Sequence, residues 1–469
     1  MADNEKYDAL IIGSGESGKY LAWTLASEGH RTAVVERKWI GGSCPNIACL
    51  PSKNIIRSAK VASFARRAAE FGLEIGSVAV NMAGVQRRKR EMVKRMVQDH
   101  VDRYEATGTE LIKGSARFVA PRTVEVSLHD GGTRRLTADR IFLNLGTRAT
   151  IPDVPGLAAA QPMTHIEALD LDRLPEHLIV LGGGYVGLEL AQAMRRFGAR
   201  VTLVEQGEHI ASREDADVSA AIHELFNDEG IKVLLKTRIA SVEGKSGQQV
   251  RVKIDAGNGP RTLEGSDLLV ATGRTPNTNG IGLEEAGIKL TPQGFIAVNE
   301  GLETSVPNVW AMGDAAGSPL FTHVAFDDFR IVRDNLRGGY RTTRDRLIPF
   351  CMFTDPELAR VGLNETEAKA QGIAYRCVKI PMASVLRMQT ISETRGFAKM
   401  LLEEESDRIL GFAAFGEEAT EMMSAVQVAM LSNTPYTTLR DTIFTHPTAA
   451  EGLTVLLAKV PAREARKAA

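Results

Sequence analysis

The chain has 469 residues, of which 43% are hydrophobic and 25% are charged, and its formal net charge is −1. This length exceeds one hydrophobic core and predicts about three domains. The near-neutral charge excludes a bulk attraction to nucleic acid or to an anionic membrane surface. Because no apolar run is long enough to span a bilayer and the polar N-terminus predicts no signal peptide, we expect a cytoplasmic protein without nucleic-acid or membrane partners.

A nucleotide-binding pattern opens the chain. The apolar run from Tyr7 to Ile12 predicts a buried strand, and the turn Gly13-Ser-Gly15-Glu-Ser-Gly18 follows it. A helical pattern comes next, and then a strand, 32–35, that ends at Glu36. In this context the glycines let the backbone approach a pyrophosphate at a helix N-terminus, and the acid can accept hydrogen bonds from a ribose. We therefore predict that Gly13, Gly15, Gly18 and Glu36 bind a dinucleotide.

Two cysteines follow this pattern closely. Cys44 and Cys49 are five residues apart, in a segment that contains Gly41, Gly42 and Pro45. In a regular helix their Cα atoms would lie roughly 8–9 Å apart, whereas a disulfide needs about 4.4–6.8 Å, so closure of the pair requires a distorted turn. We expect a regular helix from about Cys49, which puts Lys53 one turn away on the same face, where its charge favours a thiolate. The alternative is a pair of buried, inert thiols.

A basic run lies in the next helical region, at residues 87–90 and 94–95. It could be an anion-binding patch. We favour a solvated helix face, because Met92, Val93, Met96 and Val97 form the opposite face and no aromatic residues interrupt the run.

The opening pattern recurs in the middle of the chain. Alternating strands between 110 and 145 lead to Gly146, and the stiff connector 151–156 is the expected domain boundary. A strand from 177, the turn Gly182-Gly-Gly184-Tyr-Val-Gly187, a helix over 188–197 and a strand over 201–204 then end at Glu205. The first glycine and the acid are 23 residues apart in both copies (13 to 36 and 182 to 205), which predicts two nucleotide domains, one inserted in the other. Because a carboxylate at Glu205 accepts from a ribose 2′-hydroxyl and repels a 2′-phosphate, we expect NADH in preference to NADPH.

The second half of the chain adds three further candidates. A strand over 268–272 is followed by Gly273, which ends the inserted domain, and a strand that begins near Pro307 ends in Gly313-Asp314, where the carboxylate can bond a sugar or ribityl hydroxyl. After Arg341, strands over 347–354, 376–380 and 396–403 with helices over 365–371 and 420–431 predict an α+β domain. Near the end, Glu451 is close enough in sequence to orient the imidazole of His446, although an isolated histidine is usually an ordinary surface or core residue.

These segments in this order resemble the flavoprotein disulfide reductases, also called the class I pyridine nucleotide-disulfide oxidoreductases. The resemblance covers the whole chain. It implies an α/β fold with two Rossmann-like domains, for FAD and NAD, and a C-terminal α+β dimerisation domain. The implied limits are 1–150 and 276–345 for the FAD domain, 151–275 for the NAD domain and 346–469 for the dimerisation domain.

The resemblance also implies roles for the candidates. Hydride would pass from NADH to FAD, and the flavin would reduce a Cys44–Cys49 disulfide, with Cys49 as the charge-transfer thiolate and Cys44 as the interchange thiol. Lys53 would pair with Glu189 near the flavin and nicotinamide, and Asp314 would bind the ribityl chain. In the homodimer, His446 and Glu451 of one subunit would meet the cysteines of the other. Gly42, Ser43, Gly146 and Gly273 complete the predicted cofactor-binding set.

The resemblance is strongest to a branch that contains dihydrolipoamide dehydrogenases, mercuric reductases and the copper(II) reductase of the bacterial reactive-chlorine response. Dihydrolipoamide dehydrogenases have a glycine where Ala48 stands, and mercuric reductases end in a vicinal cysteine pair, whereas this chain has no cysteine after Cys377. Mercury is therefore disfavoured, and Glu205 disfavours glutathione-type reduction with NADPH. We expect a small disulfide, a metal ion or another oxidant as substrate, and no structural metal.

Two alternatives stay open at this point. The chain could be the dihydrolipoamide dehydrogenase subunit of a 2-oxo acid dehydrogenase complex, with an acyltransferase core as partner. It could also be a redox sensor without steady NADH turnover. We interpret Cys351 and Cys377, which lie on predicted strands, as buried small hydrophobic residues.

Overall fold

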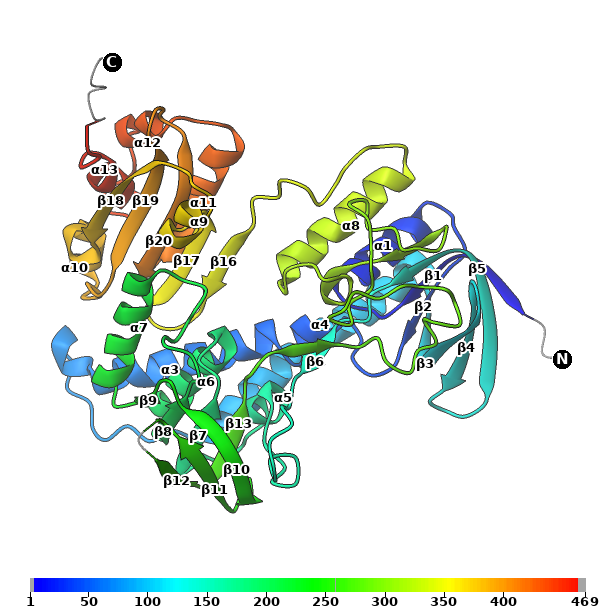
Figure 1. Cartoon of the computed structure of the whole chain (residues 1–469), viewed down its shortest axis with the longest axis horizontal. Helices are drawn as coiled ribbons and strands as arrows, with labels where there is room; N and C mark the ends of the chain where they lie inside the picture. The colour runs from blue at the N-terminus through cyan, green and yellow to red at the C-terminus, as the bar shows by residue number, and fades with distance from the viewer. Residues whose placement is uncertain (1–3, 258, 463–469) are drawn as a thin grey trace.

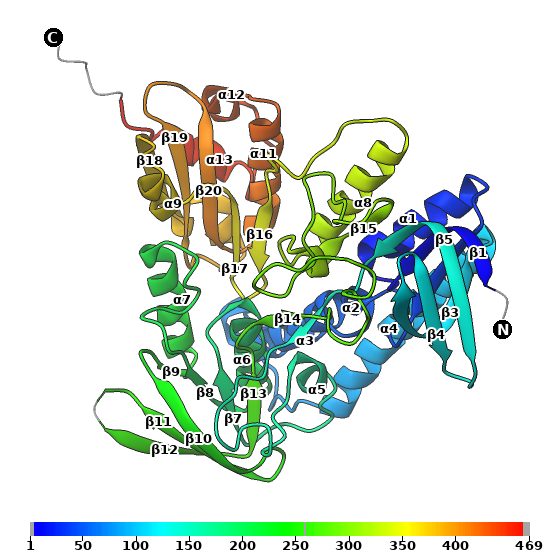
Figure 2. The same ribbon diagram turned by 45° about the vertical axis from the view of Figure 1, so that its right-hand side comes forward.

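The computed structural model describes residues 4–257 and 259–462. It contains three groups of strands, each with its own helices (Figure 1). Figure 2 shows that helices α2 (Ser43–Asn46) and α3 (Cys49–Arg66) lie where these groups meet. In the described part of the chain, no helix is long and apolar enough to cross a membrane.

The first group is a parallel sheet in the order β3-β2-β1-β5-β15, with β4 joining β3 and β5 in an antiparallel meander. Helices α1, α4 and α8 belong to this part of the molecule, and α1 packs against α8. The strand β2 and the second half of β1, residues 9–12, are buried throughout, as expected for a sheet covered on both faces. The elements are β1 (Glu5–Ile12), α1 (Glu16–Ser27), β2 (Thr32–Glu36), α4 (Met82–Thr107), β3 (Glu110–Ala120), β4 (Thr123–Leu128), β5 (Thr133–Leu143), β15 (Val309–Ala311) and α8 (Thr322–Leu336).

The second group repeats this design. A parallel sheet in the order β13-β7-β8-β9 has helices on one side and the antiparallel strands β10-β11-β12 on the other, with a core that contains Leu181, Val204, Val250 and Val270 between the two sheets. The elements are α5 (His165–Leu169), β7 (His177–Leu181), α6 (Tyr185–Phe197), β8 (Arg200–Val204), α7 (Ala216–Asp228), β9 (Lys232–Leu234), β10 (Arg238–Lys245), β11 (Gln249–Asp255), β12 (Pro260–Gly265) and β13 (Asp267–Val270). The chain enters and leaves this group through the antiparallel pair β6 (Thr147–Ala149) and β14 (Arg274–Pro276).

The third group is an antiparallel sheet in the order β16-β17-β20-β19-β18, whose core packs against helices α11 and α13. Two of its strands, β17 and β20, are absent from the sequence-based prediction. The elements are β16 (Pro349–Met352), β17 (Glu357–Gly362), α9 (Glu365–Ala370), β18 (Tyr375–Pro381), α10 (Leu386–Thr390), β19 (Phe397–Glu403), β20 (Ile409–Gly416), α11 (Ala419–Leu431), α12 (Tyr436–Asp441) and α13 (Gly452–Leu457).

The basic run lies on α4, and its arginines are exposed while Met92, Val93, Met96 and Val97 are half-buried. The interpretation as a solvated helix face is wrong for one residue. Lys89 is 4% exposed, and its ammonium group pairs with Asp170 next to α5. This lysine therefore joins α4 to the second group of strands.

Candidate active site

The two cysteines lie on either side of a break between two helices. The short helix α2 (Ser43–Asn46) contains Cys44, and α3 (Cys49–Arg66) begins at Cys49. Ala48, between them, has φ −133° and ψ −105°, outside helical geometry. The expected distorted turn and the start of a regular helix at Cys49 are thus both present. Both cysteines are free thiols in this structure.

The environment of the two thiols makes them unequal. A hydrogen bond with Cys44 lowers the pKa of Cys49 to about 6, and a contact with Thr322 and the charge of Lys53 act in the same direction against burial. The Thr322 Oγ1 lies 3.2 Å from the Cys49 Sγ. The hydrogen bond with Cys49 and burial raise the pKa of Cys44. The geometry therefore favours a thiolate at Cys49 and a neutral thiol at Cys44.

Lys53 and Glu189 form an ion pair close to this thiolate. The Lys53 Nζ lies 2.8 Å from the Glu189 Oε2, and the other carboxylate oxygen accepts the backbone N–H of Phe353 at 2.8 Å. The Lys53 Nζ also lies 4.6 Å from the centroid of the Phe353 ring. Because Glu189 is buried on α6, this pair fixes α3, the helix that begins at Cys49 and is called the dithiol helix below, against the second group of strands.

The first glycine turn packs tightly against Asn144, the residue that follows β5. A Cβ on Gly13 would lie 2.2 Å from the Asn144 carbonyl oxygen, and Gly13 has φ +97°, so only glycine fits. The Asn144 Oδ1 accepts the N–H of Gly18 at 3.0 Å, and its Nδ2 donates to the Met312 carbonyl at 3.1 Å. Asn144 therefore joins this turn to β15, a role that the sequence analysis missed because the partners are distant in sequence.

Glu36 closes the same turn from the other side. Its Oε2 accepts the N–H and the hydroxyl of Ser14 at 2.9 and 2.7 Å, and its Oε1 accepts the N–H groups of Lys38 and Trp39. Both oxygens are thus held by the protein. A ribose would find this carboxylate already oriented.

The second turn has the same close contacts but more open space. A Cβ on Gly187 would lie 2.1 Å from the Gly182 carbonyl oxygen, whereas a Cβ on Gly184 would meet no atom within 4 Å. The Glu205 carboxylate accepts the N–H groups of Gly183 and Gly207, both at 2.7 Å. The space over Gly184 is available to a ligand that approaches the N-terminus of α6.

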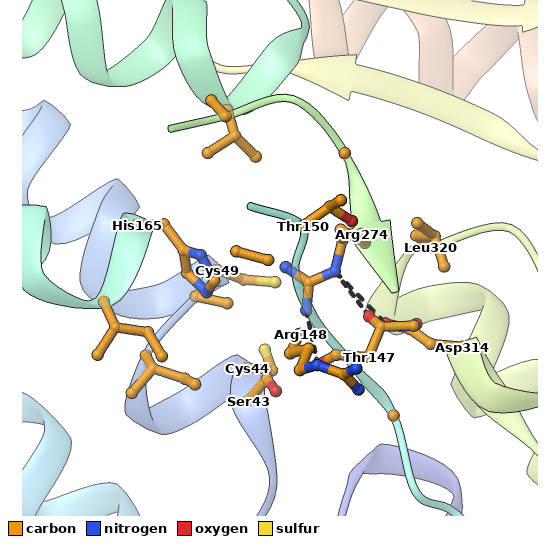
Figure 3. Close-up of a pocket in the computed structure, with 18 of the residues that line it drawn as sticks. Ser43, Cys44, Cys49, Thr147, Arg148, Thr150, His165, Arg274, Asp314 and Leu320 are labelled. Carbon is orange, nitrogen blue, oxygen red and sulfur yellow. Dashed lines mark hydrogen bonds and ion pairs between the residues drawn. The ribbon is translucent and has the colours of Figure 1, made fainter. Parts of the chain in front are cut away.

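One cavity of about 1930 Å³ contains both turns and the cysteines. It is lined by Gly13, Gly15, Glu36, Gly42, Ser43, Cys44, Cys49, Lys53, Gly146, Gly182, Gly184, Glu189, Glu205, Gly273 and Asp314. Figure 3 shows Cys44 and Cys49 between His165 and Arg274, with Arg274, Thr147 and Asp314 joined by dashed lines. Thr147 donates its hydroxyl to Asp314 at 2.6 Å and accepts at the same oxygen from the Nε of Arg274 at 2.7 Å. Gly18 and Gly187 of the predicted set lie behind the two turns, where they allow the close packing.

Cys351 also lines this cavity, which corrects its interpretation as an isolated core residue. Burial raises the pKa of Cys351, and the nearby carboxylates of Glu357 and Glu189 raise it further. It is half-buried on β16, as Cys377 is on β18. Cys351 is therefore a third, protonated thiol near the ion pair of Lys53 and Glu189.

His446 and Glu451 contact each other outside this cavity. The His446 Nδ1 lies 2.9 and 3.0 Å from the two carboxylate oxygens of Glu451, and 60% of the histidine side chain is exposed. Neither residue lines the cavity of its own chain. Among the described residues, no group of three or more histidine, cysteine or acidic side chains is arranged to hold a metal ion.

The chain was compared with known proteins. It matches the pyridine nucleotide-disulphide oxidoreductase family over residues 7–328 and the dimerisation domain of that family over residues 348–456. It is 34% identical to the probable pyridine nucleotide-disulfide oxidoreductase RclA of Escherichia coli, with 97% of this chain and 99% of that protein covered. The identity is 34% to a mercuric reductase of Streptomyces lividans (95% and 94% covered) and 33% to a dihydrolipoamide dehydrogenase of Chaetomium thermophilum (95% and 89% covered).

The fold agrees with these matches. A solved Cu(II) complex of the E. coli flavoprotein disulfide reductase RclA superimposes with a TM-score of 0.88 at 32% identity and covers 97% of this chain and 99% of that chain. The predicted family and the α/β fold class with a dimerisation domain are confirmed. The chain belongs to the pyridine nucleotide-disulphide oxidoreductases, a family of FAD-dependent oxidoreductases that take electrons from NAD(P)H.

Proposed function

We propose that this protein is an NADH- and FAD-dependent oxidoreductase that passes electrons through a Cys44–Cys49 dithiol to a small disulfide, a metal ion or another oxidant. One observation carries the proposal. Cys44 and Cys49, with unequal thiol environments, line the same cavity as two glycine turns of the dinucleotide-binding kind. The two turns provide for two cofactors, and the unequal thiols suit a dithiol that is oxidised and reduced in turn.

The residues around the first turn fit FAD. Gly13, Gly15 and Gly18 would face its pyrophosphate, Glu36 its ribose, and Asp314 its ribityl chain, while Gly42, Ser43 and Gly146 would line the path between them. A Cβ on Gly146 would meet no atom within 4 Å, so the backbone there is open to a ligand. When bound, FAD would supply the redox chemistry that connects a hydride donor to a disulfide.

The residues around the second turn fit NADH. Gly182, Gly184 and Gly187 would form the pyrophosphate turn, and Gly273 the opposite wall. Glu205, oriented by two backbone N–H groups, would accept hydrogen bonds from the adenosine ribose. Its charge would repel a 2′-phosphate, which supports NADH in preference to NADPH.

The chain's own residues divide the thiol chemistry. Cys49 would remain a thiolate, held by Thr322 and by the charge of Lys53, which Glu189 keeps in place. Cys44, with its raised pKa, would be the interchange thiol that attacks or receives the substrate. In each turnover the reduced pair, one thiolate and one thiol, would lose two electrons and one proton and close as the Cys44–Cys49 disulfide. A disulfide acceptor would take the two electrons, this proton and a second proton from water and become two thiols, whereas a metal ion would take electrons alone.

The acid–base group would come from the partner subunit. His446 of the partner subunit, oriented by Glu451 of the partner subunit, would move the proton to and from Cys44. The dimerisation domain supports a homodimer of this kind. The proposed domain limits are 1–150 with 276–345 for FAD, 151–275 for NAD and 346–469 for the dimer interface, which agree with the crossing of the chain at β6 and β14.

The test is NADH-dependent turnover of the FAD-loaded dimer with lipoamide as the first acceptor and copper(II) as the next. In Cys44→Ser, NADH should still bleach the flavin absorbance, while turnover of a disulfide acceptor should fall by at least about 1000-fold, because the nucleophile is lost. Cys377→Ser, which changes a half-buried thiol outside the cavity, is the matched control and should turn over as the unchanged protein does. Full turnover by Cys44→Ser would rule out the dithiol mechanism.

A second candidate is the dihydrolipoamide dehydrogenase subunit of a 2-oxo acid dehydrogenase complex. The 33% identity to a dihydrolipoamide dehydrogenase over 95% of this chain favours it. In that case lipoamide should be turned over at hundreds per second, within the common enzyme range of about 1–1000 per second. The protein should also copurify with an acyltransferase core. Negligible lipoamide turnover, with two thiols still generated by NADH, would leave the first proposal and remove this one.

A further inference from the structure

Glu16, the first residue of α1, lies beside the segment 42–49 that carries Cys44 and Cys49, which we call the dithiol turn. The backbone of this turn touches the residue before Glu16, since a Cβ on Gly42 would lie 2.5 Å from the Cα of Gly15. Glu16 and Cys44 both line the cavity, and Figure 3 shows the Cys44 side chain turned into it. Glu16 occupies a position of the glycine turn at which the pattern requires no particular residue, so the sequence alone predicts no role for it.

The charge of Glu16 has a definite orientation. Its Oε2 pairs at 2.8 Å with the ammonium group of Lys19, which is 4% exposed and does not line the cavity. The Lys19 Nζ also lies 3.2 Å from the Nε2 of His100, which does not line the cavity either. The pair is therefore a dipole with its negative end toward the cavity and its positive end in the protein.

The negative end acts on the groups around the interchange thiol. The hydrogen bond with Cys49 and burial raise the pKa of Cys44, and the charge of Glu16 raises it further. Tyr20, one turn along α1, lines the same cavity, and burial and then Glu16 raise its pKa as well. Arg148 and Arg274 also line the cavity beside the cysteines, and protein oxygen atoms of Pro276 and Thr147 accept their hydrogen bonds. Lys53 is paired with Glu189.

We propose that Glu16 is a specificity-determining residue, which makes the approach to Cys44 favourable for cationic acceptors and unfavourable for anionic ones. This inference rests on the proposed function, because it requires Cys44 to be the thiol that meets the acceptor. The acceptors it favours are disulfides that carry ammonium groups and metal cations. The acceptors it opposes are disulfides that carry carboxylates. The physical reason is the Coulomb energy of a charged acceptor beside a carboxylate in a partly desolvated cavity.

The opposite explanation is that Glu16 and Lys19 only shape the glycine turn for the flavin. A carboxylate at this helix N-terminus would repel a pyrophosphate, and the paired ammonium group would offset that repulsion. Under this explanation, loss of the Glu16 charge changes the affinity for FAD and has equal effects on all acceptors.

The experiment compares three disulfides with the FAD-loaded dimer at saturating NADH. The acceptors are cystamine, which carries two ammonium groups, bis(2-hydroxyethyl) disulfide, which is neutral, and 3,3′-dithiodipropionate, which carries two carboxylates. In each case NADH supplies two electrons, the enzyme dithiol passes them on, and the acceptor S–S bond is cleaved to two thiols. The variants are Glu16→Gln, which removes the charge, and Glu16→Asp, which keeps it. Glu91→Gln removes an exposed carboxylate on α4 that does not line the cavity.

For Glu16→Gln we expect kcat/KM to fall about three- to tenfold with cystamine and to rise by a similar factor with dithiodipropionate, from one unit charge at short range. The neutral disulfide should change less than about twofold, as should all three acceptors with Glu91→Gln. Glu16→Asp should keep the order of preference of the unchanged protein. The differences in kcat/KM among the three acceptors should become smaller at high salt, because salt screens the interaction between the Glu16 carboxylate and a charged acceptor.

Two results would overturn the inference. One is an equal change with all three acceptors, together with loss of bound FAD measured from the flavin absorbance, which would assign Glu16 to the cofactor. The other is that Glu16→Gln leaves the ratios of kcat/KM between the three acceptors unchanged. Both are distinct from failure of the proposed function, in which the unchanged protein would reduce none of the three disulfides.

Discussion

At the scale of single residues, the thiolate form of Cys49 depends on three neighbours of different kinds. Cys44 donates a hydrogen bond to Cys49, Thr322 lies 3.2 Å from the Cys49 sulfur, and Lys53 supplies a positive charge. Each favours the thiolate over the thiol, against the effect of burial. Because the pKa of Cys49 is thereby lowered to about 6, the thiolate should persist as the pH falls and be lost only near that value.

Replacement of Thr322 by valine tests this. The variant removes a hydrogen bond to a charged sulfur, so the pKa of Cys49 should rise by about one unit. The loss of thiolate should then occur at correspondingly higher pH. The measurement is the pH dependence of the thiolate absorbance at about 240 nm in the reduced protein. The same titration of Cys49→Ser gives the background from the other groups. Thr133→Val, at an exposed position on β5, is the control. An unchanged titration in Thr322→Val would show that this contact does not stabilise the thiolate.

Glu205 permits a second prediction at this scale. Glu205→Arg replaces a carboxylate that accepts two backbone N–H groups with a cation that can bind a 2′-phosphate. The ratio of kcat/KM for NADH to that for NADPH should fall by at least about tenfold, or about 1.4 kcal/mol. Initial rates with each nucleotide, at one fixed acceptor, measure it. An unchanged ratio would remove Glu205 as the selecting residue.

At the scale of elements, the dithiol turn and the first glycine turn are built against each other. Gly42 has φ +79°, and its Cα faces that of Gly15 so closely that a Cβ would lie 2.5 Å away. Asn144 holds the opposite side of the glycine turn. A change in one turn should therefore disturb the other, and with it the bound flavin.

Gly42→Ala should be destabilising for two reasons. Gly42 has φ +79° and ψ −163°, a backbone conformation that costs about 1–3 kcal/mol for a residue with a Cβ, and the contact with Gly15 adds strain. We expect a loss of about 2–4 kcal/mol in the free energy of unfolding, with weaker FAD retention. Gly29→Ala is the matched control, because Gly29 has φ +89° but no atom within 4 Å of its Cβ position. Thermal unfolding and the flavin content of both variants measure the difference, and equal losses would mean that the contact between the turns has no effect.

At the scale of the whole molecule, buried ion pairs join the dithiol helix to the other parts. Lys60 on α3 contacts Asp355 at 2.9 Å and also Glu417, and Arg196 on α6 contacts Asp355 and Glu229. Asp355 and Glu417 belong to the third group of strands, so this network joins α3 and α6 to that group. The same third group carries His446 and Glu451, which lie outside the cavity of their own chain.

A mixed dimer tests whether His446 acts across the subunit interface. A dimer of one Cys44→Ser subunit and one His446→Gln subunit contains one site with both changes and one site with neither, if the histidine acts on the partner's cysteines. Such a dimer should show about half the turnover of the unchanged dimer, as expected for independent sites. Each homodimeric variant is the control and should be nearly inactive. If histidine and cysteines of one chain acted together, the mixed dimer would also be nearly inactive.

The sequence by itself determined the features that depend on local patterns. Both strand–turn–helix units begin and end within a few residues of their predicted limits, because the glycines and the buried strands of each unit are contiguous in the chain. The break between Cys44 and Cys49 was expected from their spacing, the geometry that a disulfide between them would need and the glycines and proline of the segment. The strand β20 was missed because it is buried throughout and rich in glycine and alanine, so it lacks alternation and has Ile409 as its one β-branched residue.

Only the tertiary structure decided which distant residues meet. Thr322 reaches Cys49 from 273 positions away, and Asn144 reaches Gly18 from 126 positions away. Lys89 looked like one more solvated charge and is buried, and Cys351 looked isolated and lines the cavity. A side chain's surroundings depend on how helices and sheets pack, and a pattern along the chain reports only the face to which each residue belongs.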